Sequence, residues 1–480
     1  MTDLFERSQG MIMERTLQQQ RRAFQKEPPP TIEQRKERLR RLRMMVIATR
    51  EGIEEAINSD FGNRSRHETA IMELMSVVQS IDYLVRKLPR FMRAERKHVH
   101  ISHRPGRAYV IHQPLGVVGI MAPWNYPFSL SMIPLATAIA AGNRAMIKPS
   151  ELTPRTSELI QRMLAVIFPQ DEVSVVLGGP DVGAAFSSLA FDHLLFTGST
   201  QVGRKVMRAA SDNLVPVTLE LGGKSPAVIA KGAVGMQTIQ SLVYGKLSNA
   251  GQTCVAPDYV LVHEDDVAIF VERFKEVVAN FYPNGPTHPD YTSIISPRHY
   301  DRLVELLEDA RDKGAKVMTI GVRPETASQR SRTLAPTLVL DVSDIMSIMD
   351  EEIFGPILPI RTYRAMTDVI DYVNARPRPL ALYYFGPDDA DFRTLLSRTT
   401  SGNVGVNNTL MHVAQDDLPF GGIGPSGMGA YHGIEGFRAM SHAKGVYVQG
   451  RWSLARLLHA PFGRFAEFVL SVTLRRLRGY

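Results

Sequence analysis

The feature that most constrains the fold is an alternation of short apolar runs with amphipathic segments along the middle of the chain. The apolar runs lie at residues 115–121, 145–148, 173–177 and 193–196. After the second run, Thr153 and Pro154 are typical of a helix N-cap and of the first helical residue. Strands that alternate with helices build parallel sheets, so we predict an α/β fold with a doubly wound, Rossmann-like nucleotide-binding domain.

The same alternation resumes after Gly223 and predicts a second α/β domain. Its strands and helices are expected at residues 227–230, 238–248, 259–262, 267–279 and 403–407. Residues 420–429 are too rich in glycine for regular structure.

The segments before the first sheet have a different character. Helical spacing of apolar residues over 35–90 predicts helices. The polar and basic residues 98–111 predict a hairpin arm or a connection between domains.

Composition narrows the class of protein. A chain of 480 residues is too long for one ordinary core, and a single cysteine excludes a disulfide scaffold. Asp3, Glu6 and Arg7 interrupt any apolar leader, so we expect a cytoplasmic, reduced location. The formal charge of +7 suits an anionic partner, which includes nucleic acid, a phosphate-bearing cofactor and an acidic membrane surface.

Two basic segments bear on those partners. Residues 35–43 carry six basic side chains without interleaved aromatic residues, which favours a solvated helix face over nucleic-acid binding. The apolar stretch 465–474 is too short to span a bilayer. It ends in Arg475, Arg476 and Arg478, so it either contacts a membrane surface weakly or, as we favour, packs on the body.

The cysteine, Cys254, lies where a helical stretch gives way to a loop, in Gly251-Gln252-Thr253-Cys254. A lone cysteine is usually a small buried apolar residue. Its neighbours in the fold must therefore decide whether the thiol is catalytic.

Glu220 follows the alternating residues Val215, Val217 and Leu219, which mark a strand, and precedes two glycines. A carboxylate at the C-terminal end of such a strand faces the ligand crevice of an α/β fold. A salt-bridged structural glutamate is the competing interpretation.

Asn125 lies in Pro123-Trp124-Asn125-Tyr126-Pro127, between a predicted strand and a helix. Its amide can stabilise an oxygen that becomes negative during nucleophilic attack. It can equally be an ordinary turn residue.

Several residues are candidates for nucleotide binding. Gly198, Ser199 and Gly203 form a strand-to-helix turn whose spacing departs from the usual dinucleotide fingerprint, yet helix amides there can receive a pyrophosphate. Lys148 and Glu151 can hold an adenosine ribose, and the carboxylate would resist a 2'-phosphate, which favours NAD over NADP.

The ordered set of motifs, from Pro123-Trp124-Asn125 through Glu220 and Cys254 to Pro419-Phe420-Gly421-Gly422, resembles the aldehyde dehydrogenase superfamily over residues 35–445. Gly427-Met428-Gly429-Ala430-Tyr431-His432-Gly433 points to its class 3 branch. Residues 412–419 look most like those of bacterial coniferyl aldehyde dehydrogenases.

The resemblance implies roles for these residues. Cys254 is the nucleophile, Glu220 the general base and Asn125 an oxyanion donor together with the backbone amide of Cys254. The implied cofactor-binding residues are Trp124, Lys148, Glu151, Gly198, Ser199, Gly203, Glu352 and Phe354. No metal is implied, and surface acids at a turn are the alternative for Glu351 and Glu352.

The resemblance also implies the domains and the oligomer. These are an NAD(P)-binding domain at 1–93 and 112–221, a catalytic domain at 222–418, a bridging element at 94–111 and 419–445, and a helical tail at 446–480. We expect a homodimer that oxidises an aromatic aldehyde such as coniferyl aldehyde through a thiohemiacetal and a thioester. A fatty aldehyde dehydrogenase and a coenzyme A-acylating relative are the alternatives.

Overall fold

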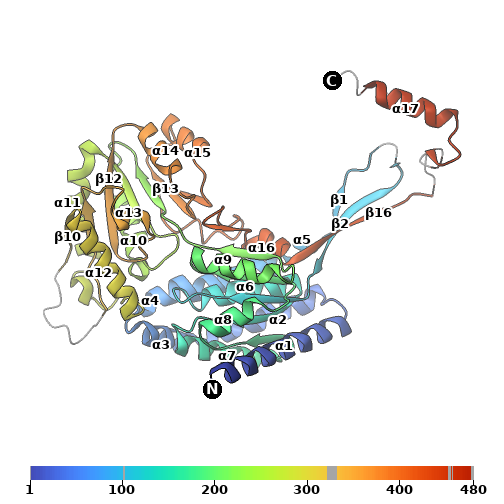
Figure 1. The fold of residues 1–480 in the computed structure, drawn as a ribbon, viewed down its shortest axis with the longest axis horizontal. Helices are drawn as coiled ribbons and strands as arrows, with labels where there is room; N and C mark the ends of the chain where they lie inside the picture. The colour runs from blue at the N-terminus through green and yellow to red at the C-terminus, as the bar shows by residue number, and fades with distance from the viewer. Residues whose placement is uncertain (1, 101–102, 322–331, 452–455, 457, 477–480) are drawn as a thin grey trace.

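The computed structural model describes the chain except residues 1, 101–102, 322–331, 452–455, 457 and 477–480. It has two α/β units side by side, a long arm that projects from the body and a terminal helix beyond the arm (Figure 1). Among the described residues, no helix is both long and apolar enough to cross a membrane.

The first unit is built on a six-stranded sheet in the order β15-β7-β6-β3-β4-β5. Its strands are β3 (Val117–Met121), β4 (Arg144–Lys148), β5 (Val173–Val175), β6 (His193–Thr197), β7 (Val217–Glu220) and β15 (Gly427–Met428). The connecting helices are α6 (Ser129–Ala141), α7 (Pro154–Ile167), α8 (Pro180–Ser187) and α9 (Thr200–Ser211). All neighbours are parallel except β15, and β3 lies between β4 and β6. The order therefore reverses at β3 and β6, which is where doubly wound sheets bind ligands.

The predicted N-cap residue of α7 is confirmed, but its side chain does not make the capping hydrogen bond. Thr153 is the N-cap residue and Pro154 follows it, but the Thr153 side chain does not cap the helix. The Thr153 hydroxyl instead donates to the carbonyl of Ser150 at 3.4 Å. The carboxylate of Asp60, on a neighbouring helix, accepts from the amides of Arg155 and Thr156 at 3.1 and 2.9 Å.

The second unit contains a seven-stranded sheet in the order β10-β11-β12-β9-β8-β13-β14. Its strands are β8 (Pro226–Ile229), β9 (Tyr259–His263), β10 (Lys316–Thr319), β11 (Thr337–Leu340), β12 (Ile357–Tyr363), β13 (Ala381–Phe385) and β14 (Asn403–Val406). Its helices are α10 (Met236–Leu247), α11 (Val267–Phe281), α12 (Pro297–Asp312), α13 (Ser347–Asp350), α14 (Met366–Asn374) and α15 (Ala390–Arg398). Only β10 pairs antiparallel to its neighbour, so the predicted second α/β unit is present.

Helices at the N-terminal end cover the first sheet. They are α1 (Thr2–Lys26), α2 (Ile32–Ala48), α3 (Arg50–Phe61), α4 (Arg66–Thr69), a π-helical turn (Ala70–Met75) and α5 (Ser76–Phe91). We did not predict α1, although its Gln20 side chain is buried and donates to the carbonyl of Ala145 at 3.1 Å.

The basic residues of α2 are exposed or half-exposed except one, and Arg38 and Arg43 form ion pairs with Glu172 and Asp82. Arg35 is buried, and its guanidinium donates to the carbonyls of Pro30 and Ala140 at 3.0 and 2.9 Å. The interpretation of residues 35–43 as one solvated face was wrong at Arg35, because this cation satisfies the Ala140 carbonyl near the end of α6 and the Pro30 carbonyl before α2.

The arm is a three-stranded antiparallel sheet of β1 (Glu95–Lys97), β2 (Arg107–Pro114) and β16 (Ser441–Val448). The hairpin predicted from residues 98–111 is therefore part of a sheet closed by a distant strand. Within residues 419–440, β15 pairs with β7, and α16 (Gly433–Ala439) packs against α6. The domain boundaries stay a prediction.

The C-terminal tail differs from the prediction that we favoured. Helix α17 (Arg464–Arg476) lies beyond the arm and away from the body (Figure 1), and Phe465, Phe468 and Leu474 are exposed. Packing on the body was therefore wrong, because α17 lies apart from the described part of the body. Arg478 lies outside the described residues.

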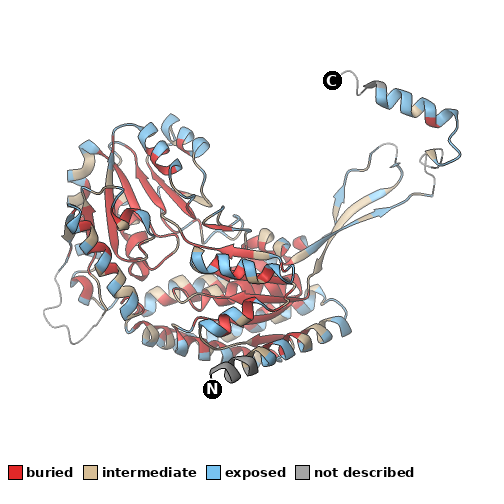
Figure 2. Ribbon diagram, viewed as in Figure 1, coloured by how far each residue is buried: buried red, intermediate tan, exposed pale blue. Residues whose placement is uncertain are grey.

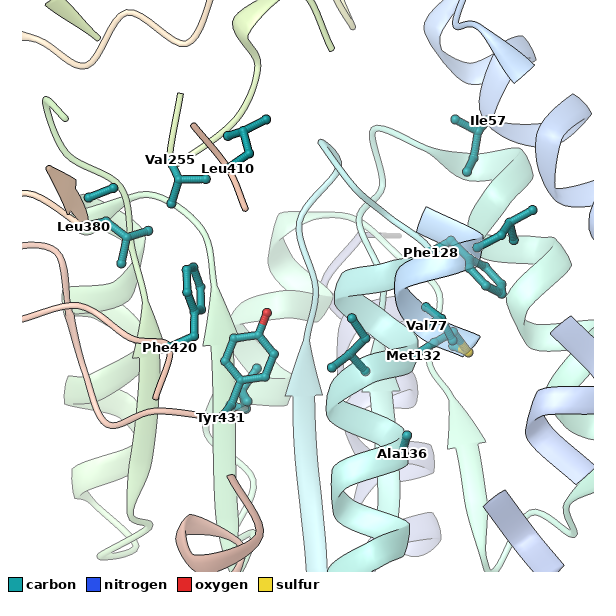
Figure 3. Close-up of a cluster of buried hydrophobic side chains, with 14 of the residues drawn as sticks. Ile57, Val77, Phe128, Met132, Ala136, Val255, Leu380, Leu410, Phe420 and Tyr431 are labelled. Carbon is teal, nitrogen blue, oxygen red and sulfur yellow. The ribbon is translucent and has the colours of Figure 1, made fainter. Parts of the chain in front are cut away.

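One apolar core continues across both units. Most strands of both sheets are buried, whereas the edge strand β10 and the arm are half-buried or exposed and α17 is mainly exposed (Figure 2). Phe128 and Met132 of α6 belong to the same cluster as Val255 and Leu380, with Phe420 and Tyr431 between them (Figure 3). The two units therefore pack together around the segments that carry the candidate site.

Candidate active site

The turn that carries Cys254 has an unusual backbone. Asn249, Ala250 and Gly251 have φ values of 52, 50 and 76°, in the left-handed region. Non-glycine residues adopt this region at a cost and need support from their surroundings. The carboxylate of the half-buried Glu68 accepts from the Asn249 amide, and Gln252 donates to the Asn249 carbonyl at 2.9 Å. The turn is therefore strained and firmly held.

Asn125 meets this turn from the other unit. Its buried side chain donates to the carbonyl of Gln252 at 3.1 Å. Its own carbonyl accepts from the Asn249 side chain at 2.9 Å and from Arg64 at 3.1 Å. The structure thus brings Asn125 to the cysteine turn, as the sequence predicted.

A buried ion pair supports Asn125, and sequence reasoning missed it. Arg64 and Glu73 are both fully buried and lie 2.8 Å apart. The second carboxylate oxygen of Glu73 accepts from the amides of Phe128 and Ser129 at 2.8 and 3.0 Å, at the start of α6. Arg64 lies in the loop between α3 and α4 and Glu73 in the π-helical turn, so only the low frequency of buried charges could have singled them out.

Glu220 is the last residue of β7 and is buried. Neither carboxylate oxygen has a hydrogen-bond partner among the described residues. Burial raises the pKa of this carboxyl well above its ordinary value. The glycine-rich segment packs over it, because a Cβ at Gly421 would lie 3.1 Å from Oε1 of Glu220. A buried carboxyl that has a raised pKa and no partner fits the role of a general base. It does not fit the role of a structural glutamate, which would form a salt bridge.

The thiol of Cys254 is partly exposed and lies among acidic groups. Burial and the charges of Glu352 and Glu220 raise its pKa to about 12, while backbone amides of Cys254 and Val255 oppose the shift. The thiol form therefore predominates at neutral pH. The same amides are donors that an oxyanion formed next to the sulfur can use.

Glu352 and Phe354 lie on a clamped loop before β12. The ammonium of Lys224 donates to the carbonyl of Glu351 at 2.8 Å, and Arg302 donates to the carbonyl of Glu352 at 3.2 Å. Glu352 lies directly over Gly222, where a Cβ would overlap its carboxylate. Burial raises the pKa of Glu352 to about 8.

The ring of Phe354 faces Trp124 with centroids 5.4 Å apart. Phe354 has a φ of 55°, so its backbone is held in the left-handed region. Two residues predicted to bind the cofactor, from different units, are thus in contact.

The remaining predicted cofactor residues lie at the C-terminal ends of β4 and β6. Lys148 pairs with Glu151 at 3.2 Å. The exposed Ser199 is the N-cap of α9, and the amide of Gly198 donates to the carbonyl of Glu220 at 3.0 Å.

Gly203 is buried within α9, where a Cβ would lie 2.7 Å from Leu221. Its lack of a side chain therefore permits close packing of the helix. A direct contact of Gly203 with the cofactor stays a prediction.

These residues fit a dinucleotide on three structural observations. The residues lie at the switch point of the sheet, the N-terminus of α9 begins there at Ser199, and the absence of a Cβ at Gly222 lets the Glu352 carboxylate approach the backbone closely. Among the residues that the structure describes, no group of three or more His, Cys, Asp or Glu could hold a metal.

The chain belongs to the aldehyde dehydrogenase family, whose model matches residues 5–446. It is 50% identical to the probable coniferyl aldehyde dehydrogenase of Pseudomonas aeruginosa, over 94% of each chain. The substrate-bound structure of Staphylococcus aureus AldH superposes with a TM-score of 0.89 at 35% identity, over 96% of this chain and 98% of that one. The NAD+ complex of a Bacillus cereus aldehyde dehydrogenase superposes with a TM-score of 0.83 at 25% identity, over 92% of this chain and 89% of that one.

These findings confirm several predictions from the sequence. The superfamily, its class 3 branch, the likeness to bacterial coniferyl aldehyde dehydrogenases and the α/β fold are shown. The chain is an NAD(P)-dependent oxidoreductase of the aldehyde group. The roles of single residues stay predictions.

Proposed function

We propose that the chain oxidises coniferyl aldehyde to its carboxylic acid, with Cys254 as nucleophile, Glu220 as general base and Asn125 as oxyanion donor. One observation carries the residue roles. The turn that carries the half-buried Cys254 holds the Asn125 side chain, and the thiol feels the charge of Glu220, a buried carboxyl without a hydrogen-bond partner among the described residues.

The chemistry follows from these positions. The Cys254 sulfur bonds to the aldehyde carbon, and the new oxyanion accepts hydrogen bonds from the Asn125 amide and from the backbone at Cys254. Because the thiol pKa is raised, its proton must be lost to solvent as the bond forms, and Glu220 acts only after the hydride has left. Glu220 later removes a proton from water, whose oxygen attacks the thioester carbon, and the acid leaves as the thiol reforms.

The cofactor supplies the acceptor for the hydride that the oxidation removes. Lys148 and Glu151 would hold the adenosine ribose, and the turn at Gly198 and Ser199 would receive the pyrophosphate. Glu352, Phe354 and Trp124 would contact the nicotinamide side, with Gly203 beneath the turn. The Glu151 carboxylate favours NAD over NADP by repelling a 2'-phosphate.

The substrate class rests on the relative from Pseudomonas aeruginosa, which is 50% identical. A fatty aldehyde is the second candidate, because the sequence resembles the class 3 branch, and a relative from rat named aldehyde dehydrogenase family 3 member A2 is 38% identical. A coenzyme A-acylating enzyme would not need the unpaired Glu220.

The test is a comparison of kcat/KM for cinnamyl, benzyl and medium-chain aliphatic aldehydes with NAD and NADP. We expect coniferyl aldehyde to be among the best substrates and the free acid to form without coenzyme A. Preference for aliphatic aldehydes would overturn the substrate, and a requirement for coenzyme A would overturn the role of Glu220.

We propose further that the chain works as a cytoplasmic homodimer, with the free thiol kept reduced. The arm and the exposed apolar residues of α17 support association, and α17 also supports weak contact with a membrane surface. Light scattering of the full chain and of a chain ending at 450 tests the first. Salt-sensitive binding to anionic vesicles, lost on truncation, tests the second.

A further inference from the structure

Two histidines near Cys254 have no role in the chemistry above. His412 and His432 have relative exposures of 8% and 4%. None of their four ring nitrogens has a hydrogen-bond partner among the described residues. Buried polar groups are nearly always paired, because an unpaired donor or acceptor is costly, so two neighbouring exceptions call for a partner outside the chain.

Aromatic rings connect both imidazoles to the site. Phe420 stacks on His432, with the ring centroids 5.0 Å apart, and its centroid lies 6.3 Å from that of His412. Phe420 therefore lies next to both histidines. The ring centroids of Tyr431 and His432 are 4.5 Å apart, and those of Tyr383 and His412 are 5.6 Å apart. Phe420 and Tyr431 lie between the two units (Figure 3).

These tyrosines are also close to the thiol. The charge of Cys254 contributes to raising the pKa of both Tyr383 and Tyr431, and Tyr383 donates to the carbonyl of Val255 at 2.6 Å. One tyrosine ring thus separates each imidazole from the neighbourhood of the sulfur. When the aldehyde carbon of a substrate is bonded to Cys254, the opposite end of the substrate would lie near these tyrosines and the imidazoles beyond them.

The segment that carries His412 is fixed at both ends. The amide of Thr409 donates to the Ser241 hydroxyl on α10 at 2.9 Å. Ser80 and Tyr83 of α5 donate to Asp416 and Asp417, each at 2.5 Å. His432 is the N-cap residue of α16. Both rings are therefore held in place before a ligand arrives, as a specific site requires.

Burial also sets the chemistry that the pair can offer. It lowers the pKa of each histidine to about 4, so both rings are neutral near neutral pH. A neutral imidazole has one N–H donor and one acceptor nitrogen. Neutral rings in an apolar cluster suit an uncharged ligand that both donates and accepts, and they do not suit a carboxylate or a phosphate.

We propose that His412 and His432 bind the ring oxygens of a phenolic aldehyde, and so select substrates that carry a hydroxyl and an alkoxy group opposite the aldehyde. The phenol hydroxyl donates to one imidazole nitrogen, and the neighbouring oxygen accepts from the other ring. This inference rests on the proposed function. Purely aliphatic aldehydes leave all four nitrogens unpaired and are disfavoured by the same site.

The experiment compares coniferyl aldehyde with cinnamaldehyde, which lacks both ring oxygens, in the full chain and in His412→Phe and His432→Phe. We expect the unsubstituted enzyme to prefer coniferyl aldehyde. In each variant this preference should fall about tenfold to a hundredfold, the range for a lost buried hydrogen bond, while kcat/KM for cinnamaldehyde stays within a few-fold. His442→Phe, at an exposed residue of the arm, is the matched control and should change neither value.

The outcomes separate the inference from the function on which it rests. If the unsubstituted enzyme oxidises neither aldehyde, the proposed function fails. If it oxidises both and the preference is absent, or survives in both variants, the histidines hold only buried water and the inference is overturned. If the variants do not fold, 3,4-dimethoxycinnamaldehyde with the unsubstituted enzyme decides. We expect a loss of about tenfold relative to coniferyl aldehyde, and equal kcat/KM would overturn the inference.

Discussion

Replacement of Arg64 by methionine tests whether the buried pair with Glu73 holds the site together. Removing one partner of a buried ion pair costs about 3–5 kcal/mol, because the other charge stays buried and unpaired. Arg64 also lies over the rings of Phe61 and Tyr126, at 5.0 and 4.8 Å, contacts that methionine replaces only in part. Because Glu73 can take up a proton, its pKa being raised by burial, we expect a loss near 3 kcal/mol. Loss of the hydrogen bond to the Asn125 carbonyl should also lower kcat by up to about a hundredfold.

Urea unfolding followed by circular dichroism measures the stability, and steady-state kinetics measures kcat. Arg66→Met is the control, since its ion pair with Glu55 is 65% and 59% exposed and should contribute less than about 1 kcal/mol. The double variant Arg64→Met with Glu73→Gln should recover part of the loss, because no charge then remains buried. A loss below 1 kcal/mol in Arg64→Met, or one equal to that of Arg66→Met, would refute the reasoning.

Three further perturbations test the electrostatics and the cofactor crevice. Glu352→Gln removes a negative charge that raises the pKa of Cys254, so more thiolate forms at a given pH and iodoacetamide alkylates the thiol faster; an unchanged pH profile of alkylation would contradict this cause. Gly222→Ala places a Cβ against the Glu352 carboxylate. We expect kcat/KM for NAD to fall at least about tenfold, while the free energy of unfolding changes little. Unchanged NAD kinetics would show that the loop carrying Glu352 moves freely. Glu151→Gln should raise the preference for NADP relative to NAD about tenfold, measured by the ratio of kcat/KM, since an exposed carboxylate no longer repels the 2'-phosphate; a constant ratio would remove Glu151 from cofactor selection.

The sequence predicted the residues of the site that follow strands of the first sheet. Glu220 ends β7, Asn125 follows β3 and Lys148 ends β4, and the C-terminal ends of parallel strands meet at one edge. Periodicity and strand order were enough to bring these side chains together.

Cys254 and Glu352 could not be placed in this way. They precede β9 and β12, at the opposite ends of strands in the second sheet, so strand topology alone does not bring them to Glu220. Their proximity depends on how the two units pack, and the sequence linked them only through a family resemblance.

The supporting groups escaped prediction for a different reason. Glu73 and Arg35 are charged residues in helical segments and Arg64 is in the loop between α3 and α4, where a solvated position is the ordinary expectation. Arg35 donates to the Ala140 carbonyl near the end of α6, and Glu73 accepts from the Phe128 amide at its start. Arg64 donates to the Asn125 carbonyl, so tertiary contacts hold all three charges in the interior. The position of α17 likewise depends on the arm that precedes it. The periodicity of apolar residues within α17 does not predict that position.

The most direct test of the central claim is rapid mixing of aldehyde and NAD with the unsubstituted enzyme, Glu220→Gln and Cys254→Ala, monitored by NADH absorbance. If Glu220 acts after oxidation, Glu220→Gln should give a rapid burst of NADH stoichiometric with active sites, followed by slow turnover. Cys254→Ala should give no NADH while still binding NAD. Unchanged steady-state turnover in Glu220→Gln would contradict the role of the base, and oxidation by Cys254→Ala near the rate of the unsubstituted enzyme would contradict the nucleophile.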